Sequence, residues 1–306
     1  MAQRAPNPGR VAWLFPGQGS QRVGMTRALL AAAPSLAEWF TQVDAAVAAP
    51  LSTLIAEGPD AALVQTANQQ PAIVAVSLAW LRALEARELA PEPAFVAGHS
   101  LGEYSALAAV GALDPLDAVR LVRRRGELMQ EHGAGGMAAV IGLPPAAVAA
   151  IAADVGVEVA NYNAPEQTTV TGRTEAVARA MALAKERGAK RVVRLPVSAA
   201  FHSSLMAPAI DGMAAALATT TIRPALAPLV ANTDAEPIAA PEALRRELLE
   251  QICAPVRWTD IVRFLIDEGV TTFYEIGPGK VLAGLVGRCA PGATVIAAES
   301  LLAERA

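Results

Sequence analysis

Short runs of apolar residues that end in glycine-containing turns constrain the fold of this chain most strongly. Three such runs are Val11–Phe15, Ala94–Ala97 and Thr272–Ile276, and helical segments separate them. One of these helices is long and apolar, and we expect it to begin at Gln70-Pro71 and to end near Arg87. Short buried strands that alternate with helices are typical of a parallel sheet. We therefore predict an α/β fold in which helices cover both faces of a mainly parallel sheet.

The order of the predicted elements changes between residues 136 and 200. There the chain runs strand, helix, strand, strand, helix, strand, which is the order of a ferredoxin-like domain. The segments are Met137–Ile141, Pro144–Val155, Val157–Asn161, Thr168–Thr171, Thr174–Arg187 and Arg191–Val197. We predict that residues 136–200 form a small ferredoxin-like (βαββαβ) domain. It would be inserted into a large α/β-hydrolase-like domain that residues 1–135 and 201–306 form together.

Charge and composition argue against several kinds of partner. The net charge is −4 and there is no basic tail, so we expect no nucleic-acid partner. The first ten residues are polar, and no strongly apolar run reaches about 18 residues, so we expect neither a signal sequence nor a membrane span. Cys253 and Cys289 fit no metal-binding spacing. We expect them to be reduced, in a cytoplasmic protein that needs no metal and no cofactor.

The strongest local motif is Gly98-His99-Ser100-Leu101-Gly102, a G-x-S-x-G between a predicted strand and a predicted helix. A nucleophilic serine on such a tight turn needs glycine on either side, because a Cβ atom there would clash. The turn lifts the hydroxyl above the sheet and points backbone N–H groups toward a reacting carbonyl. Ser100 is therefore the candidate nucleophile; the alternative is a plain strand-to-helix turn that contains a serine.

A serine nucleophile needs a base, and the chain has only three histidines. His99 is adjacent to Ser100, so its side chain should leave the turn in another direction, and His132 lies beside flexible glycines. His202 follows the last strand of the predicted insertion, at a domain junction where clefts form. We predict His202 as the base, the alternative being a capping or buried histidine. No acidic residue stands out to orient it, and a backbone carbonyl can take that role.

Two further segments are weaker signals. The glycine-rich turn Pro16–Gln21 follows the first strand, and one of its N–H groups could complete an oxyanion hole with that of Leu101. The alternative is a simple turn. The run Arg123–Arg125 is typical of a solvated helix face. Its functional interpretation is one arginine held in a cleft, where the planar guanidinium binds a carboxylate with two parallel hydrogen bonds.

Together these residues resemble the malonyl-CoA:acyl carrier protein transacylases, the acyltransferase family of fatty acid and polyketide synthesis. The resemblance covers nearly the whole chain in order, so it is far more specific than any single motif. The matching segments are Val11–Met25, Gly98–Gly111, Arg125–Leu143, Asn161–Pro165, Phe201–Met206, Gln251 with Pro255-Val256, and Glu275–Gly279.

The resemblance implies catalytic roles at the matching positions. Ser100 would be acylated, and His202 would act first as its base and then as an acid. The backbone N–H groups of Gln18 and Leu101 would hold the oxyanion. Gln251 would orient His202 through its main-chain carbonyl, which is consistent with the missing acidic partner.

The resemblance also implies substrate contacts. Arg125 would bind the free malonyl carboxylate. In related polyketide domains a phenylalanine directly before the histidine accompanies malonyl selection, and Phe201 stands there; its ring would fill the space that a methyl branch needs. The preceding Ala199-Ala200 departs from common variants, which leaves the choice of malonyl over methylmalonyl open. Further residues expected near the substrate are Gln70, Asn161 and Asn163.

The implied activity is transfer of malonyl from malonyl-CoA to the phosphopantetheine thiol of an acyl carrier protein, by a monomer that meets its acidic carrier transiently. Fatty acid synthesis and a discrete acyltransferase acting in trans on a polyketide synthase both fit. A serine thioesterase or esterase is the rival enzyme, and a non-catalytic carrier-docking protein would not need Ser100 and His202. An acidic carrier needs a basic docking face. Our candidates for it are Lys190, Arg191, Arg194, Arg123 and Arg124.

Overall fold

The computed structural model describes residues 10–197 and 199–303. The first nine residues, which bear on the prediction of no signal sequence, lie outside this part, as do Ser198 and residues 304–306. No helix within the described ranges has both the length and the apolar character that a membrane crossing requires.

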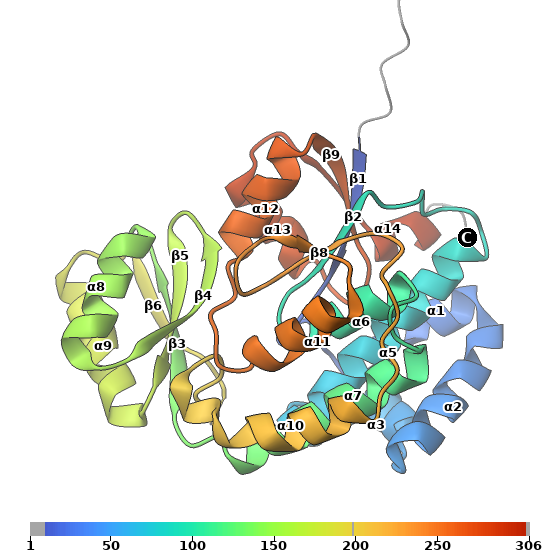
Figure 1. Cartoon of the computed structure of the whole chain (residues 1–306), viewed down its shortest axis with the longest axis horizontal. Coiled ribbons are helices and arrows are strands. Elements are labelled where there is room, and N and C mark those ends of the chain that lie inside the picture. Colours follow the sequence, from blue (N-terminus) through green and yellow to red (C-terminus); the bar gives the residue numbers. More distant parts are fainter. Residues whose placement is uncertain (1–9, 198, 304–306) are drawn as a thin grey trace, which may run out of the picture.

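The larger sheet has 6 strands in the order β10-β9-β1-β2-β7-β8 (Figure 1). Neighbouring strands pair in parallel, except for the short antiparallel pair of β7 and β8. Phe15 at the end of β1 lies opposite Gly98 at the end of β2, which brings the two glycine turns together. The α/β prediction is confirmed. The strands are β1 (Arg10–Phe15), β2 (Phe95–Gly98), β7 (Leu229–Val230), β8 (Pro237–Ile238), β9 (Val270–Glu275) and β10 (Thr294–Ala297).

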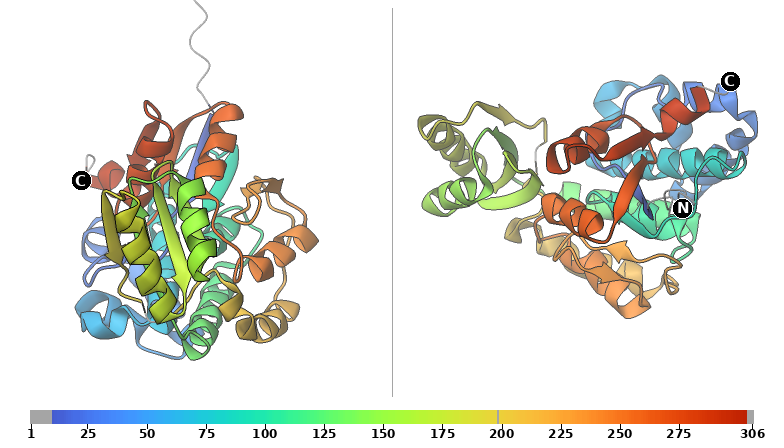
Figure 2. Two further views of the ribbon diagram at one scale, coloured as in Figure 1. Left: turned by 90° about the vertical axis from the view of Figure 1, so that its left-hand side faces the viewer. Right: turned by 90° about the horizontal axis from the view of Figure 1, so that it is seen from above.

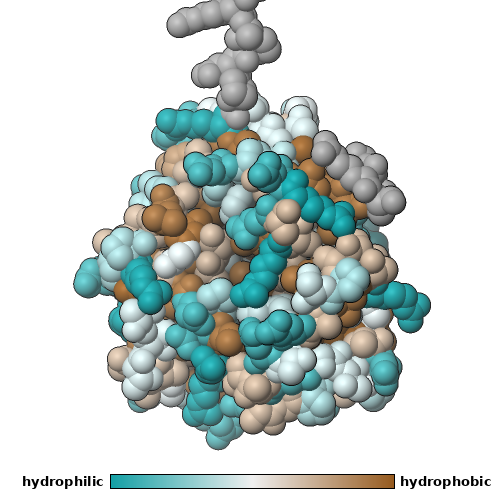
Figure 3. Space-filling view, turned by 90° about the vertical axis from the view of Figure 1, so that its right-hand side faces the viewer, coloured by the Kyte–Doolittle hydropathy of each residue, from teal (hydrophilic) through white to brown (hydrophobic). Residues whose placement is uncertain are grey.

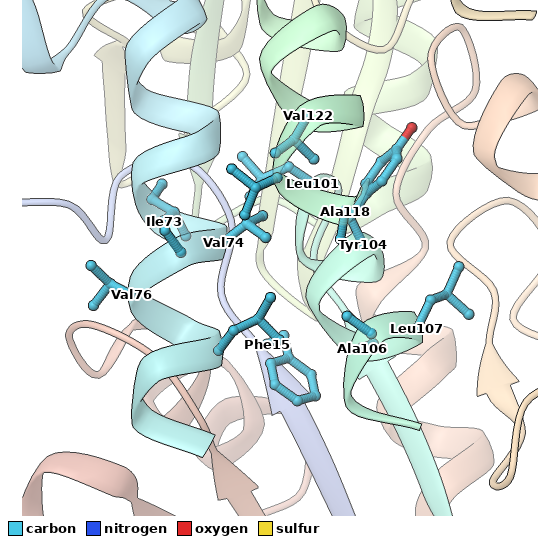
Figure 4. Close-up of a cluster of buried hydrophobic side chains, with 14 of the residues drawn as sticks. Phe15, Ile73, Val74, Val76, Leu101, Tyr104, Ala106, Leu107, Ala118 and Val122 are labelled. Carbon is cyan, nitrogen blue, oxygen red and sulfur yellow. The ribbon is translucent and has the colours of Figure 1, made fainter. Parts of the chain in front are cut away.

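Helices cover both faces of this sheet, as the side chains of β1 show. Trp13 and Phe15 pack into one apolar core, whereas Ala12 and Leu14 pack into another. Figure 4 shows part of the first core, where Phe15, Val74 and Leu101 gather between helices. The helices are α1 (Arg27–Ala32), α2 (Ala37–Val47), α3 (Leu51–Glu57), α4 (Asp60–Leu63), α5 (Thr66–Glu85), α6 (Gly102–Ala109), α7 (Pro115–Glu131), α10 (Pro208–Ala218), α11 (Pro241–Glu250), α12 (Trp258–Asp267), α13 (Val281–Cys289) and α14 (Ala298–Ala303).

A second, smaller sheet stands to one side of the large one (Figures 1 and 2). Its 4 strands are antiparallel, in the order β4-β5-β3-β6, which is the ferredoxin-like arrangement. It has an apolar core of its own. The division of the chain at residues 136 and 200 stays a prediction. The elements are β3 (Gly136–Ile141), α8 (Pro145–Val155), β4 (Glu158–Ala164), β5 (Gln167–Gly172), α9 (Thr174–Glu186) and β6 (Arg191–Arg194).

The long helix α5 begins earlier than the sequence pattern indicated. It starts at Thr66, so Pro71 lies inside it rather than at its first turn. Proline has no N–H to donate to the carbonyl four residues before it, which is that of Ala67. Nη1 of Arg123 donates to this oxygen instead, at 3.1 Å. A tertiary contact therefore compensates the proline, and it ties down one of the arginines proposed for carrier docking.

The turn between β2 and α6 should not tolerate a side chain at residue 98. A Cβ atom on Gly98 would lie 2.0 Å from the carbonyl carbon of Gly102 and 2.1 Å from the nitrogen of Glu103. We expect Gly98→Ala to lower the free energy of unfolding by at least about 3 kcal/mol in urea titrations, because backbone must move. Gly284→Ala on α13 is the matched control. Its Cβ meets no atom within 4 Å, so it should be neutral or stabilise by up to about 1 kcal/mol. Equal midpoints for the two variants would contradict this packing.

Candidate active site

Ser100 occupies a strained turn that Asn232 holds in place. The φ angle of Ser100 is 56°, in the left-handed region that non-glycine residues rarely adopt. Asn232 follows β7, and its Oδ1 accepts the Ser100 N–H at 2.7 Å. Its Nδ2 donates to the carbonyl of Gly98, also at 2.7 Å. One side chain from the loop after a neighbouring strand therefore fixes both sides of the turn.

His202 lies against the hydroxyl of Ser100. Its Nε2 is 2.7 Å from Ser100 Oγ. Its Nδ1 faces two main-chain carbonyls, Gln251 at 2.8 Å and Ala254 at 3.1 Å. Carbonyls only accept, so Nδ1 carries the ring proton and Nε2 is free to accept from the serine. The pairing needs no acidic residue, as the sequence suggested.

The imidazole of His202 is neutral over a wide range of pH. Burial, reinforced by the positive charge of Arg125, lowers the pKa of His202 to about 3. The ring is therefore available as a proton acceptor well below neutral pH.

Arg125 is the arginine of its run that points inward. It is 1% exposed, and its Nη2 donates to Ser100 Oγ at 3.1 Å and to Gln251 Oε1 at 2.6 Å. Its Nη1 donates to Gln70 Oε1 at 2.9 Å. Within the described residues its Nε has no hydrogen-bond partner and no ion pair includes its guanidinium. A buried cation held only by neutral groups is costly unless an anion joins it.

A cavity of about 450 Å³ opens onto Ser100 and His202. Gln18, Gln69 and Phe201 line it from the large unit, and residues of the small unit complete its wall. A site at the junction of two packed units is a common place for a substrate. The lining residues from the small sheet and from the segment that follows its last strand, β6, are Met137, Asn161, Leu195, Pro196 and Val197.

The turn after β1 packs directly on the serine turn. A Cβ atom on Gly17 would lie 2.5 Å from the carbonyl oxygen of His99, so only glycine permits this contact. In the ranges that the structure covers, the N–H groups of Gln18 and Leu101 donate to no protein group. The side chain of Gln18 donates to Gln69 Oε1 at 2.5 Å. Two backbone donors on adjoining turns thus remain free near the serine.

The other predicted residues take different places. Asn161 lines the cavity, whereas Asn163 lies against His99: its Oδ1 accepts from His99 Nε2 at 2.9 Å. The His99 ring also packs on Trp258, with 5.4 Å between ring centroids, so it leaves the turn as expected. Gln70 contacts Arg125 rather than the cavity wall.

The sequence analysis missed Gln69, which lines the cavity, and the polar residues Asn232, Glu103 and Glu247 behind the serine turn. Asn232 had a usable signal, because it is the first polar side chain after the short strand Leu229–Val230, and polar groups at the carboxyl ends of parallel strands often serve a site. The two glutamates had none, since each stands on a helix where a solvent-exposed carboxylate is the ordinary expectation.

Comparisons with known proteins agree with this geometry. A family model described as acyl transferase domain matches residues 12–297. The malonyl CoA-acyl carrier protein transacylase of Bacillus subtilis is 43% identical over 285 residues, covering 90% of this chain and 89% of the relative. The structure of the transacylase of the same name from Coxiella burnetii matches with a TM-score of 0.93 and 38% identity, over 97% of both chains.

A further structure holds a malonyl-transacylase in complex with its type II PKS acyl-carrier protein. It matches with a TM-score of 0.92 and 37% identity, and the match covers 97% of this chain and 100% of the other. The likeness therefore extends over the serine turn, the histidine and both units of the fold. The chain belongs to the malonyl CoA-acyl carrier protein transacylase family of acyl transferases.

Proposed function

We propose that this enzyme transfers a malonyl group from malonyl-CoA to the phosphopantetheine thiol of an acyl carrier protein, through an ester on Ser100. The observation that carries the proposal is the position of Arg125, whose Nη2 lies 3.1 Å from Ser100 Oγ. Hydrolysis of a neutral ester needs no buried cation beside the nucleophile. A malonyl donor does need one, because its free carboxylate must be compensated when it leaves water.

The first half-reaction loads the serine. His202 Nε2 takes the hydroxyl proton of Ser100 as Oγ attacks the thioester carbonyl. The carbonyls of Gln251 and Ala254 stabilise the imidazolium through Nδ1. The N–H groups of Gln18 and Leu101 donate to the oxyanion. The tetrahedral intermediate then collapses, and the proton on Nε2 goes to the departing thiolate of coenzyme A.

The second half-reaction unloads the serine. The carrier thiol gives its proton to His202 and attacks the malonyl ester, and Ser100 recovers the proton from the imidazolium as the new thioester forms. The substrates and these residues account for every proton and electron pair, so we propose no metal and no cofactor.

Selection among acyl groups rests, in our proposal, on Arg125, which contacts Ser100 Oγ, and on Phe201 in the cavity wall. Within the described residues, the Nε–H and one Nη1–H of Arg125 donate to no protein group, and we propose that they bind the malonyl carboxylate. Phe201 lines the cavity beside His202 and is 4% exposed, so its ring limits the space at the carbon that a methyl branch would occupy. We propose malonyl as the preferred group over methylmalonyl.

The fate of the acyl group tests the proposal. The enzyme incubated with malonyl-CoA and a phosphopantetheinylated carrier protein should give malonyl-carrier in the mass spectrum. Free malonate formed at an equal rate would indicate a thioesterase instead. Relative rates with carriers of fatty acid and of polyketide synthesis separate the two pathways, and the carrier-bound polyketide relative favours testing both.

The carrier docks transiently, in our proposal, near the mouth of the cavity. Arg123, Arg124 and Lys190 are engaged with Glu127 or Glu166. Arg194 lines a hollow of about 810 Å³ that shares Leu195, Pro196 and Val197 with the cavity. Neither Arg191 nor Arg194 forms an ion pair within the described residues, and Arg194 is the candidate that lies at this hollow, so we propose it as the main contact of an acidic carrier.

We retain the expectation of a cytoplasmic monomer as part of this proposal. On the face shown in Figure 3, polar and apolar side chains are interspersed. Interfaces between subunits tend instead to gather apolar side chains into one patch.

The lowered pKa of His202 predicts an unusual pH profile. An ordinary histidine base, with a pKa near 6.5, would lose about 30-fold in activity on going from neutral pH to about pH 5. Because the pKa of His202 is lowered to about 3, the base stays unprotonated over that interval. We expect kcat/KM for loading of Ser100 from malonyl-CoA to change by less than about twofold between about pH 5 and about pH 8. A decline centred near pH 6.5 would contradict the lowered pKa of His202.

A further inference from the structure

Two buried glutamates with no role in the mechanism lie directly behind Gln251. Glu103 on α6 is 0% exposed and Glu247 on α11 is 3% exposed. Oε1 of each accepts the same N–H, that of Asn232, at 2.8 Å and 2.9 Å. Two carboxyl groups that converge on one N–H in a buried site cannot both be ionised without strong repulsion. The two groups must therefore hold one proton between them.

The hydrogen bonds indicate where the proton resides. Glu247 also accepts the N–H of Thr233 at 3.1 Å and its hydroxyl at 2.5 Å, a set of donors suited to an ionised carboxylate. Among the described residues, Glu103 accepts one further bond, from Gln251 Nε2 at 2.8 Å. Burial and the neighbouring charge of Glu247 raise the pKa of Glu103 well above its usual range. Glu103 thus carries the proton and Glu247 the charge.

Gln251 connects this pair to the reacting groups. Its Nε2 donates to Glu103 Oε2 and, at 3.1 Å, to the carbonyl of Ser100. Because both of these partners are acceptors, the amide must turn its Oε1 toward Arg125 Nη2, 2.6 Å away. The main-chain carbonyl of the same residue accepts from His202 Nδ1. One glutamine therefore orients both the base and the cation.

We propose that Glu103 and Glu247 form a proton-sharing pair that positions Gln251, and through it Arg125, and that the single negative charge of the pair is the remote counter-charge of Arg125. The link to malonyl rests on the proposed function. A carboxylate bound directly to the guanidinium would compete with the carboxylate of the substrate. A negative charge on the far side of the Gln251 amide offsets the free-energy cost of burying the cation, and it leaves the unpaired N–H groups of Arg125 available to the substrate carboxylate.

Other charged groups near the pair do not replace this arrangement. The other titratable groups that interact electrostatically with Glu103 or with each other are Tyr104 on α6 and Arg125 on α7. Burial raises the pKa of Tyr104, so its phenol stays neutral. No lysine or arginine makes an ion pair with either glutamate in the described ranges. The hydrogen-bonded path from the pair to the guanidinium runs through Gln251.

Two variants of Glu103 separate the effect of its hydrogen bonds from the effect of its side-chain volume. Glu103→Gln mimics the protonated acid, because its amide can donate to Glu247 and accept from Gln251, and Asn232 keeps Glu247 as an acceptor. It should load malonyl within about threefold of the wild type. Glu103→Leu leaves Gln251 Nε2 short of an acceptor and frees the amide to turn. We expect its loading rate from malonyl-CoA, relative to that from acetyl-CoA, to fall about 10- to 100-fold, because only malonyl depends on a fixed Arg125.

The proton itself is tested by infrared spectroscopy at neutral pH. The difference spectrum of wild type minus Glu103→Gln should contain the C=O band of a buried carboxylic acid. This measurement does not depend on malonyl transfer, so a failure of the proposed function leaves it intact. The proposal is overturned if the band is missing, if Glu103→Gln loses as much malonyl loading as Glu103→Leu, or if a folded Glu103→Leu loses malonyl and acetyl loading in equal proportion.

Discussion

Replacing Ser100 with alanine should leave the enzyme unable to take up a malonyl label. Oγ is the atom that bonds to the acyl group, and the hydroxyl has both His202 Nε2 at 2.7 Å and Arg125 Nη2 at 3.1 Å within reach. Without it no ester forms, and transfer should fall by at least about 10⁴-fold, the loss typical of a removed serine nucleophile. Intact-protein mass spectrometry after incubation with malonyl-CoA measures the label directly.

Ser105 provides a matched control on α6, the helix that follows the serine turn. Its Oγ is buried and finds no hydrogen-bond partner among the described residues. Ser105→Ala therefore removes a hydroxyl of the same kind at no cost in hydrogen bonds, and both label and transfer rate should stay at the wild-type level. Stoichiometric labelling of Ser100→Ala would place the nucleophile elsewhere. Loss of labelling in Ser105→Ala would show that the assay reports damage to α6 rather than chemistry.

The serine turn was predictable because its requirements are local. Gly98 and Gly102 make room for the turn, and the strand before it and the helix after it are legible in the sequence. The pairing with His202 is not local, since 102 residues separate it from Ser100. It followed only from the scarcity of histidines and from the junction where this one stands. A chain with more histidines would have left the base undecided.

The three adjacent arginines show a limit of sequence patterns, which do not indicate which of the three side chains faces the site. Successive residues on a helix point about 100° apart, so only one of the three can face the site. Arg123 binds the carbonyl that Pro71 leaves unpaired, Arg124 pairs with Glu127 at 3.6 Å, and Arg125 turns inward. Residue types alone do not distinguish these roles, because each depends on what another element presents. The family resemblance, not the pattern, pointed to Arg125.

The buried network behind the site was beyond prediction for the same reason. Glu103 stands in the first turn of α6, where an acidic residue is ordinarily explained by the helix dipole. Glu247 stands on an amphipathic helix rich in charged residues. Their meeting at Asn232 depends on the packing of three separate elements. Local rules assign such residues to the surface, so exceptions of this kind emerge only from the structure.

Replacing Arg125 with alanine should change which acyl group the enzyme accepts. The guanidinium is the one buried cation within reach of Ser100 Oγ in the described residues, and a malonyl carboxylate in the cavity would otherwise stay uncompensated. We expect kcat/KM for malonyl-CoA to fall about 10²- to 10³-fold, the effect of removing one partner of a buried charge pair. Acetyl-CoA carries no such carboxylate, so its kcat/KM should fall far less, and the ratio of acetyl to malonyl loading should rise.

Arg124→Ala is the control that separates this effect from a general loss of positive charge. Arg124 precedes Arg125 on the same helix, but its side chain is 47% exposed and pairs with Glu127 at the surface. Arg124→Ala should leave kcat/KM for malonyl-CoA and for acetyl-CoA unchanged, since an exposed ion pair contributes little. The ratio matters more than either rate, because Arg125→Ala also leaves the amide oxygens of Gln70 and Gln251 without their donor. Such damage slows every acyl group alike, whereas only the loss of a carboxylate-binding cation discriminates between them. An unchanged ratio in Arg125→Ala would therefore reject this arginine as the selector of malonyl, however large the fall in rate.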